Sequence, residues 1–373
     1  MSEYQFVHFL AIDRPLDDEQ LEFMRRQSSR AEITRWEFTN EYHFGDFHGN
    51  AREMLRRGYD VHLHYANFGI RRLMMRLPAG LPCDQRTFDA FQPEYGVAWH
   101  ADTRGKGGIL EIQPEADAGT YGEDVYETAP LLRKIAAARD LLIAGDLRLL
   151  YLAWLACHGD EESLEPPVPA GLGKLTPALK AIAEFYEVGQ DLVAAAAEQS
   201  PPLPKSTDAD EPLKKWIAKQ SPKHLRELVE RFLGKGAAAT RAETLSSIRS
   251  ATPTAAWPMA EPTRTLAQLR ESARGRGDQR IQQEQQARDA ARRKRLETIA
   301  ADPGKLIANV EKLRKERSVA SYEQAAKELA DLREALGPEK GPGRARAVAE
   351  RLRRENPRLH RLIAALRKQG LLK

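Results

Sequence analysis

The sequence predicts an α+β protein, with a mixed N-terminal α/β domain, an α-helical middle and a basic helical tail. Three observations lead to this fold class. Short segments of the first 115 residues alternate apolar and polar side chains, as strands with one buried face do. From residue 129 onward, apolar residues recur at helical spacing instead. Residues 263–373 then hold 28 Lys and Arg against 15 Asp and Glu, a net charge of +13.

Breaks in composition divide the chain into four regions. Residues 161–174 are rich in Pro and Gly, and a later segment is rich in Ala, Thr, Ser and Pro; both compositions are typical of linkers. We therefore expect an α+β domain with terminal helices over 1–165, a helical region over 174–234, a flexible linker over 235–262 and the basic helical tail over 263–373.

The first elements form a compact strand–helix–strand unit. Residues 4–12 are apolar and aromatic, which favours a strand. Asp17 or Asp18 can cap the helix that follows, because their carboxylates can accept the unpaired N–H groups of its first turn. Residues 31–38 alternate again, with some irregularity, and predict a second strand. A short helix is expected over 51–57.

The stretch from Glu41 to Pro78 is the densest run of aromatic, histidine and glycine residues in the chain. Apolar and polar residues alternate along 60–65, which places His62 and His64 on one face of a strand and the apolar residues on the other. A second strand is expected over 71–77, joined to the first by a tight turn. This stretch is therefore the first candidate for a specific binding surface.

A hairpin and a buried helix complete the front of the chain. Residues 95–100 and 108–113 are predicted to be paired strands around a basic, glycine-rich turn, after a short helix over 84–91. Helical periodicity begins at residue 129. The nearly all-apolar segment 147–157 is then expected to be a helix packed against the sheet.

Helices are expected over the rest of the chain. Thr176-Pro177 opens a helix that runs to about residue 199, and Pro222 divides an amphipathic segment. Residues 263–301 are polar and predict an exposed single helix or a loose coiled coil. Ser321 and Gln324 form a capping-box pattern. Three helices complete the tail, over 305–317, 321–336 and 344–372, the last one broken at Asn356-Pro357.

Composition excludes several classes of protein. The only two cysteines, Cys83 and Cys157, favour a reducing, cytoplasmic environment and exclude both a disulfide framework and a cysteine-rich zinc module. No apolar run approaches the length that crosses a bilayer, and the N-terminus lacks the pattern of a signal peptide. We therefore expect a cytoplasmic protein without a membrane partner.

The histidine-rich stretch is the best candidate for a metal site. His62 and His64, two apart on a strand, project to one face and can both bind a metal. His43, Asp46 and His48 would complete a mixed donor set suited to zinc, iron or manganese. The alternative is a set of hydrogen-bonded histidines among aromatic side chains, since no HExxH spacing is present.

Three basic segments are candidates for binding phosphate or nucleic acid. The first is the turn over 103–108, whose backbone could hold a phosphate, although a plain hairpin turn is favoured. The second is an aromatic–basic patch near Arg71, where a strand with one solvated face is favoured. The third lies in the tail and is the strongest, with an alternative as a solvated helix of i,i+4 charge pairs. Its cations are Arg274, Arg276, Arg280, Arg288, Arg292, Arg293, Lys294 and Arg295.

Charge distribution and missing catalytic motifs together favour a non-enzymatic binding or scaffold protein. The tail carries +13, whereas the rest of the chain holds 30 Lys and Arg against 39 Asp and Glu, a net −9. A basic tail attracts nucleic acid without sequence preference, or an acidic protein partner. The alternative function is a metal-dependent enzyme with its centre at the histidine-rich stretch.

Two parts of the chain resemble known families. The segments FLAIDRPL, SSRAEIT, GDF and YANFG, at 9–16, 28–34, 45–47 and 65–69, resemble an uncharacterised bacterial family, which implies a bacterial cytosolic protein. The tail segments SYEQAA, LADLR, NP and LIAALRKQGL, at 321–326, 329–333, 356–357 and 362–371, are similar to the helical tail of bacterial SWIM zinc-finger proteins. That resemblance implies nucleic-acid or protein binding, although the zinc ligands of those proteins have no counterpart here.

Overall fold

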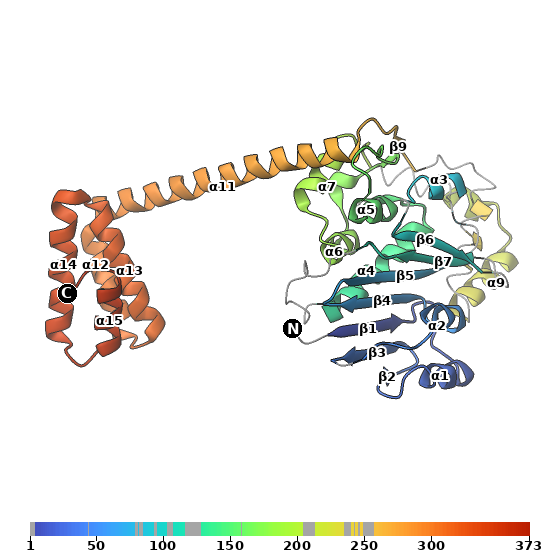
Figure 1. Ribbon diagram of the computed structural model, residues 1–373, viewed down its shortest axis with the longest axis horizontal. Helices are drawn as coiled ribbons and strands as arrows, with labels where there is room; N and C mark the ends of the chain where they lie inside the picture. The colour runs from blue at the N-terminus through green and yellow to red at the C-terminus, as the bar shows by residue number, and fades with distance from the viewer. Residues whose placement is uncertain are drawn as a thin grey trace. The chain divides into compact units, whose positions relative to one another are not determined.

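The computed structural model divides the chain into two compact units, Met1–Arg276 and Gly277–Lys373, and each is described by itself (Figure 1). The predicted α+β class is confirmed: a seven-stranded antiparallel sheet lies in the first unit, and the second is helical. The residues that the structure describes are 4–43, 45–78, 81, 85–92, 95–102, 107–115, 128–157, 159–203, 213–234, 240–241, 243–244, 247–248 and 257–373.

The sheet has the strand order β2-β3-β1-β4-β5-β7-β6, and all neighbouring strands in it pair antiparallel. Strand β4 lies at the centre, with all six residues buried. Hairpins join β4 to β5 and β6 to β7, as predicted. The strands are β1 (Gln5–Leu10), β2 (Glu32–Ile33), β3 (Glu37–Tyr42), β4 (Val61–Ala66), β5 (Ile70–Pro78), β6 (Val97–Ala101) and β7 (Gly107–Ile112).

Helices pack on both faces of this sheet, so the protein buries two core layers. Helices α1 (Asp18–Arg25) and α2 (Ala51–Arg57) cover the face that carries Phe9 and Met74. Helices α4 (Thr128–Ile143), α5 (Arg148–Ala156) and α6 (Pro177–Phe185) build the larger core, which includes the opposite face with Leu63. The alternation predicted along 60–65 is therefore present, and the face that carries the histidines is buried as well.

Two predicted elements are divided in the structure. The strand expected over 31–38 is split into β2 and β3, because the hydroxyl of Thr34 accepts hydrogen bonds from the N–H groups of Trp36 and Glu37 and turns the chain. The helix expected from Thr176 to about residue 199 ends at Phe185 and resumes as α7 (Gln190–Ala197). Glu187, with a φ of 54°, breaks it.

Shorter elements complete the first unit. Helix α3 (Gln85–Asp89) precedes the second hairpin, a 3₁₀ turn η2 (Leu172–Lys174) precedes α6, and Pro222 opens α9 (Pro222–Leu233). Strand β8 (Val168–Pro169) pairs with β9 (Met259–Ala260). Residues 257–276, which the sequence analysis divided between linker and tail, thus belong to this unit.

Buried polar side chains fix these elements. Arg264 donates to Glu165, which also accepts a 2.7 Å hydrogen bond from the hydroxyl of Tyr151, and this network holds the start of the long helix α11 (Leu266–Ala301) on α5. The thiol of Cys157 is buried, which raises its pKa to about 12 and leaves it a packing residue. Cys83, Asp84 and the turn 103–106 lie outside the described residues.

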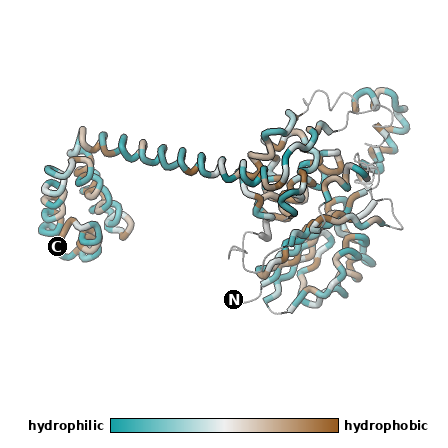
Figure 2. The backbone as a smooth tube through the Cα atoms, turned by 45° about the horizontal axis from the view of Figure 1, so that its top comes forward, coloured by the Kyte–Doolittle hydropathy of each residue, from teal (hydrophilic) through white to brown (hydrophobic). Residues whose placement is uncertain are grey.

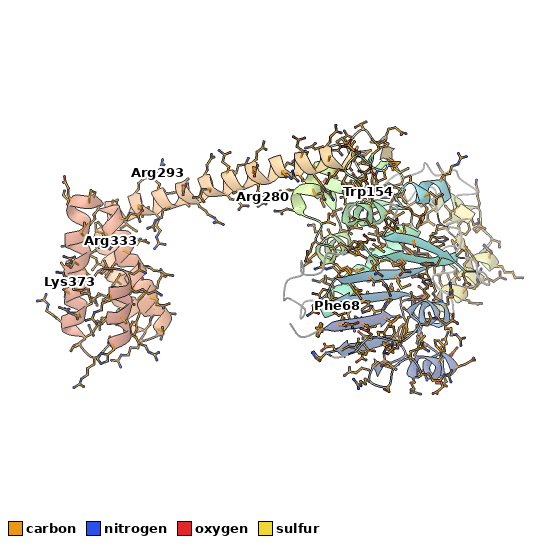
Figure 3. The ribbon with its side chains drawn as sticks, in the orientation of Figure 1. Phe68, Trp154, Arg280, Arg293, Arg333 and Lys373 are labelled. Carbon is orange, nitrogen blue, oxygen red and sulfur yellow. The ribbon has the colours of Figure 1, made fainter. Side chains whose placement is uncertain are left out.

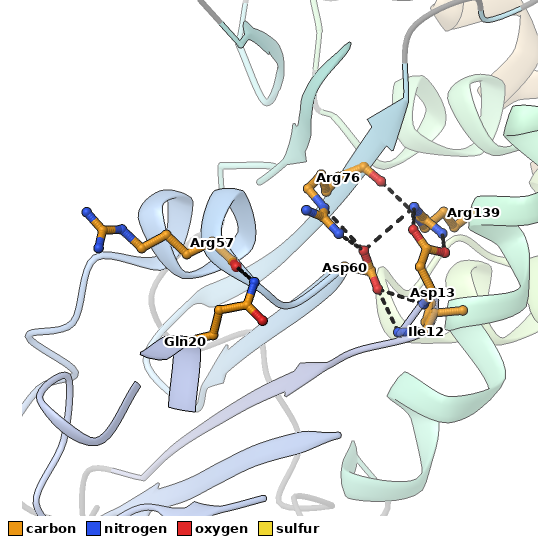
Figure 4. Close-up of polar contacts among 7 residues, drawn as sticks. All are labelled: Ile12, Asp13, Gln20, Arg57, Asp60, Arg76 and Arg139. Carbon is orange, nitrogen blue, oxygen red and sulfur yellow. Dashed lines mark hydrogen bonds and ion pairs between the residues drawn. The ribbon is translucent and has the colours of Figure 1, made fainter. Parts of the chain in front are cut away.

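A second buried network joins the ends of β1, β4 and β5 to α4 (Figure 4). Arg139, 1% exposed, donates two 2.9 Å hydrogen bonds to Asp13 and one of 2.7 Å to the carbonyl of Arg76. Asp60 accepts from Arg76 and from the backbone N–H groups of Ile12 and Asp13. Burial alone would raise the pKa of Asp60, but Arg76 and Arg139 lower it below its usual value.

The second unit consists of the C-terminal part of α11 and four helices with their own apolar core (Figure 1). Figure 2 shows that α11 is largely hydrophilic, in agreement with the predicted exposed helix. Leu329, Leu352 and Leu366 come from three of these helices and are fully buried together. The four helices are α12 (Pro303–Lys315), α13 (Val319–Ala335), α14 (Gly337–Glu355) and α15 (His360–Lys368).

Two details of this unit differ from the sequence analysis. The capping box of α13 uses Ser318 and Ser321 instead of Ser321 and Gln324, because the helix begins at Val319. Helix α14 begins at Gly337, seven residues before the start at residue 344 that the sequence predicted. Its start is compatible with Pro338 in the first turn. In the described part of the chain, no helix is long and apolar enough to cross a membrane.

Candidate nucleic-acid interface and buried histidine pair

Of the four consecutive cations predicted on α11, two form ion pairs with α13 and two are exposed. Arg292 donates to Asp331 at 2.7 Å and to Glu334 at 2.6 Å, and Arg295 forms an ion pair with Asp331 at 2.7 Å. These two arginines therefore hold α11 against α13. Helical geometry turns the intervening Arg293 and Lys294 away from that contact, and both are exposed. Figure 3 labels Arg293 on α11.

The other predicted cations of α11 are also divided. Arg276 pairs with Glu198 of the first unit, with 2.7 Å between Nε and Oε1, and thus serves packing. Arg280 pairs with Glu284 one turn later at 3.1 Å, as the solvated-helix alternative expects. Arg274 and Arg288 are exposed. Residues 277–301 hold six Lys and Arg against four Asp and Glu, so this part of α11 is only weakly basic.

The most basic surface lies further along the chain, where the sequence analysis did not name site residues. Residues 340–373 hold eleven Lys and Arg against two Asp and Glu. The composition of this segment was the signal that would have found it. One face of α14 is buried, so all of its arginines except the half-buried Arg351 lie on the solvent side. Exposed arginines of α14, α15 and their connection are Arg344, Arg346, Arg353, Arg354, Arg358 and Arg361.

Several carboxylates of the second unit form ion pairs inside it. Glu311 accepts from Arg314 at 3.0 Å and from Arg351 at 2.9 Å, and Asp331 forms ion pairs with Arg292 and Arg295 of α11. A hollow of about 780 Å³ opens beside Asp331 and its two arginines, and Lys327 and Arg333 also line it. Among the described residues, the exposed arginines of α14, α15 and their connection form no ion pair. Their positive field therefore faces solvent.

The histidine pair lies on β4, on the sheet face beneath α1 and α2. His62 is fully buried and its ring stacks on Phe9, with 4.0 Å between the ring centroids. His64 is 7% exposed, and the two imidazole centroids are 6.3 Å apart. Burial, followed by the charge of Arg72, lowers the pKa of His64 to about 4; burial is also the main cause that lowers the pKa of His62. Both rings are therefore neutral at pH 7.

Hydrogen bonds fix the tautomer of each ring. Nδ1 of His62 lies 3.2 Å from the carbonyl oxygen of His8, which can only accept, so the proton is on Nδ1. Gln5 donates its amide N–H to Asp46 at 2.6 Å, so its Oε1 accepts from Nε2 of His64 at 3.0 Å. Nε2 of His62 and Nδ1 of His64 thus carry lone pairs, and both atoms are buried without a hydrogen-bond partner in the described structure.

The other predicted metal ligands are on the surface. His43, Asp46 and His48 are exposed, and Asp46 reaches the pair only through Gln5. Among the described residues, no three His, Cys, Asp or Glu side chains gather in a way that could hold a metal ion. The sequence analysis missed Gln5 because it comes from β1, far from the histidines in sequence.

The aromatic–basic patch around Arg71 serves packing. Arg71 is 9% exposed and donates to the carbonyl of Phe185 and to Glu187, which holds the end of α6. Arg72 lies on the histidine face, 3.4 Å from Glu111, and Arg76 belongs to the buried network of Asp60. Glu111 also accepts from Arg52 at 2.9 Å.

Comparison with known proteins adds no family to this description. No protein-family model matches the sequence, and no match is found among curated proteins or solved structures.

Proposed function

We propose that the protein binds nucleic acid through the phosphate backbone, using the exposed arginines of α14 and α15, without itself catalysing a reaction. The observation that carries this proposal is the charge of residues 340–373, eleven cations against two carboxylates, on helices with their own core. Arginine is suited to phosphate because its planar guanidinium donates two parallel hydrogen bonds. Such contacts give affinity that depends on salt and not on base sequence.

The helical geometry favours a rigid basic surface over a flexible charged tail. Arg346 and Arg353 are seven residues apart on α14, so they lie on one side of the helix, about 10 Å from each other along its axis. Ala345, Ala349 and Leu352 of the same helix are fully buried, which fixes the orientation of that side. Because the arginines are preorganised, binding does not have to order the helix.

The test is fluorescence anisotropy of labelled duplex DNA and single-stranded RNA with the full chain, between 50 and 200 mM salt. Arg346→Glu/Arg353→Glu should weaken binding at least about tenfold and make the salt dependence shallower by about one unit per lost phosphate contact. The control is Arg56→Glu/Arg226→Glu, which makes the same charge change on exposed residues of α2 and α9.

Two outcomes would contradict the proposal. An equal loss in the control would show that only net charge matters. If the chain binds neither DNA nor RNA at 50 mM salt, or if its binding does not weaken between 50 and 200 mM, nucleic acid is excluded as the partner. An acidic protein would then be the remaining partner for this surface. Duplex DNA and RNA bound alike would agree with backbone recognition, because phosphates are common to both.

A further inference from the structure

We propose that His62 and His64, together with the thioether of Met74, form a binding site for one monovalent copper ion, Cu(I). This inference is independent of the nucleic-acid proposal, because the three residues lie on the sheet of the first unit. It rests on two unpartnered lone pairs, on the register of two strands and on the charge of the surroundings.

The imidazole nitrogens have the state that a metal ligand requires. A histidine binds a metal through the unprotonated nitrogen while the other nitrogen donates to a carbonyl or carboxylate-linked group, which fixes the ring. His62 donates from Nδ1 to the carbonyl of His8, and His64 donates from Nε2 to Gln5. The remaining nitrogen of each ring is buried without a partner in the described structure, a costly arrangement unless something binds there.

Strand register supplies a third donor. Met74 of β5 is the direct partner of His62 on β4, and directly paired residues of antiparallel strands project to the same face with neighbouring Cβ atoms. Met74 is 1% exposed and belongs to the same apolar cluster as Phe9. A thioether is a soft ligand that favours Cu(I) over zinc, magnesium or manganese.

The surroundings also favour a monovalent ion of low coordination number. Solvent reaches the fully buried His62 poorly, so a metal there has few water ligands. Cu(I) is stable with only two or three donors, and imidazole and thioether are both among its ligands. Arg72 of β5 lies opposite His64, and its charge is shared with Glu111 at 3.4 Å. A single additional positive charge is tolerated more readily beside this arginine than the double charge of Zn²⁺.

The experiment is an anaerobic titration of the full chain with Cu(I) against a chromophoric Cu(I) chelator. The wild type should bind one Cu(I) per chain. Met74→Leu conserves side-chain volume and should weaken Cu(I) binding about tenfold or more. Loss of a residue that only orients a metal ligand already costs about tenfold in metal affinity, and loss of a ligand should cost at least as much. His64→Gln should abolish stoichiometric binding.

The matched control is Met75→Leu, at the next residue of β5. Met75 is also fully buried but belongs to the core on the opposite face, so its removal should leave Cu(I) affinity unchanged. Far-ultraviolet circular dichroism of each variant checks that the fold is retained. The proposal is overturned if the wild type takes up no Cu(I), if His64→Gln binds like wild type, or if Met74→Leu and Met75→Leu have equal effects.

Discussion

At the scale of single residues, buried charges and histidines decide how the first unit is held together. Asp60 is fully buried and pairs with Arg76 and Arg139, and Arg139 is itself anchored to Asp13 and to the carbonyl of Arg76. Removing one member of such a network leaves the others charged and desolvated, which costs more than the network itself contributes. The two histidines of β4 are buried as neutral rings, so their protonation at low pH does not stabilise the folded state.

Asp60→Ala should lower the free energy of unfolding by about 3–5 kcal/mol, because Arg76 and Arg139 lose their shared carboxylate and two backbone N–H groups lose their acceptor. Denaturant titration measures this change. The comparison variant is Asp18→Ala, which removes an exposed ion pair with Arg35 and should cost no more than about 1 kcal/mol. Equal losses would show that the buried network is not exceptional.

Stability should fall as pH drops below 6.5. Burial lowers the pKa of His8, His62 and His64 in the folded state, the last to about 4 from the ordinary 6.5. The unfolded chain therefore takes up these protons first, so stability is complete above pH 6.5 and is lost progressively toward pH 4. Between these two pKa values, His64 contributes up to about 1.4 kcal/mol per pH unit.

His64→Gln should reduce that pH dependence by the share of one proton, measured as the free energy of unfolding at pH 7, 6 and 5. The control is Val7→Ala, on the β1 residue directly opposite His64. It should lower stability at every pH by a similar amount and leave the dependence unchanged, because valine does not titrate. A slope that His64→Gln leaves intact would mean that His64 is not the buried neutral base described here.

At the scale of elements, the second unit depends on close helix packing. A Cβ built at Gly341 of α14 would lie 1.9 Å from the carbonyl oxygen of Arg333 on α13, which no side chain tolerates without moving the backbone. The glycine is therefore needed for the crossing of these helices. This contact explains why a segment with two prolines and three glycines near its start still forms a helix that packs from its first turn.

Gly341→Ala should destabilise the second unit by about 1–3 kcal/mol, because α13 and α14 must separate. Gly343 lies two residues later on the same helix with nothing within 4 Å of an added Cβ. Gly343→Ala should therefore stabilise the unit by up to about 1 kcal/mol through helix propensity alone. Thermal unfolding of both variants gives the comparison, and shifts of the same sign would show that the close approach is not limiting.

At the scale of the whole molecule, charge is segregated between the two units. Residues 277–373 hold 24 Lys and Arg against 14 Asp and Glu, whereas residues 1–276 hold 34 against 40. The net charge of +4 therefore conceals one unit at +10 and another at −6. A polyanion is attracted to the second unit and repelled by the first. This segregation of charge supports placing the proposed nucleic-acid interface on the second unit.

The local pattern of the sequence alone determined several structural features of this protein. The alternation along 60–65 placed His62 and His64 on one face, the composition of 147–157 placed a helix in the core, and the excess of Lys and Arg marked the C-terminal unit. These features depend on neighbours in sequence, whose geometry is set by the backbone repeat of a strand or helix.

Only the tertiary structure decided which of these side chains remain available. Arg292 and Arg295 are bound by carboxylates of α13, about 40 residues later, while Arg293 between them is exposed. The lone pairs of the histidines depend on Gln5 and on the backbone of a different strand. No local pattern reports such partners, because long-range pairing is fixed by packing of distant segments and not by the spacing of residues along the chain.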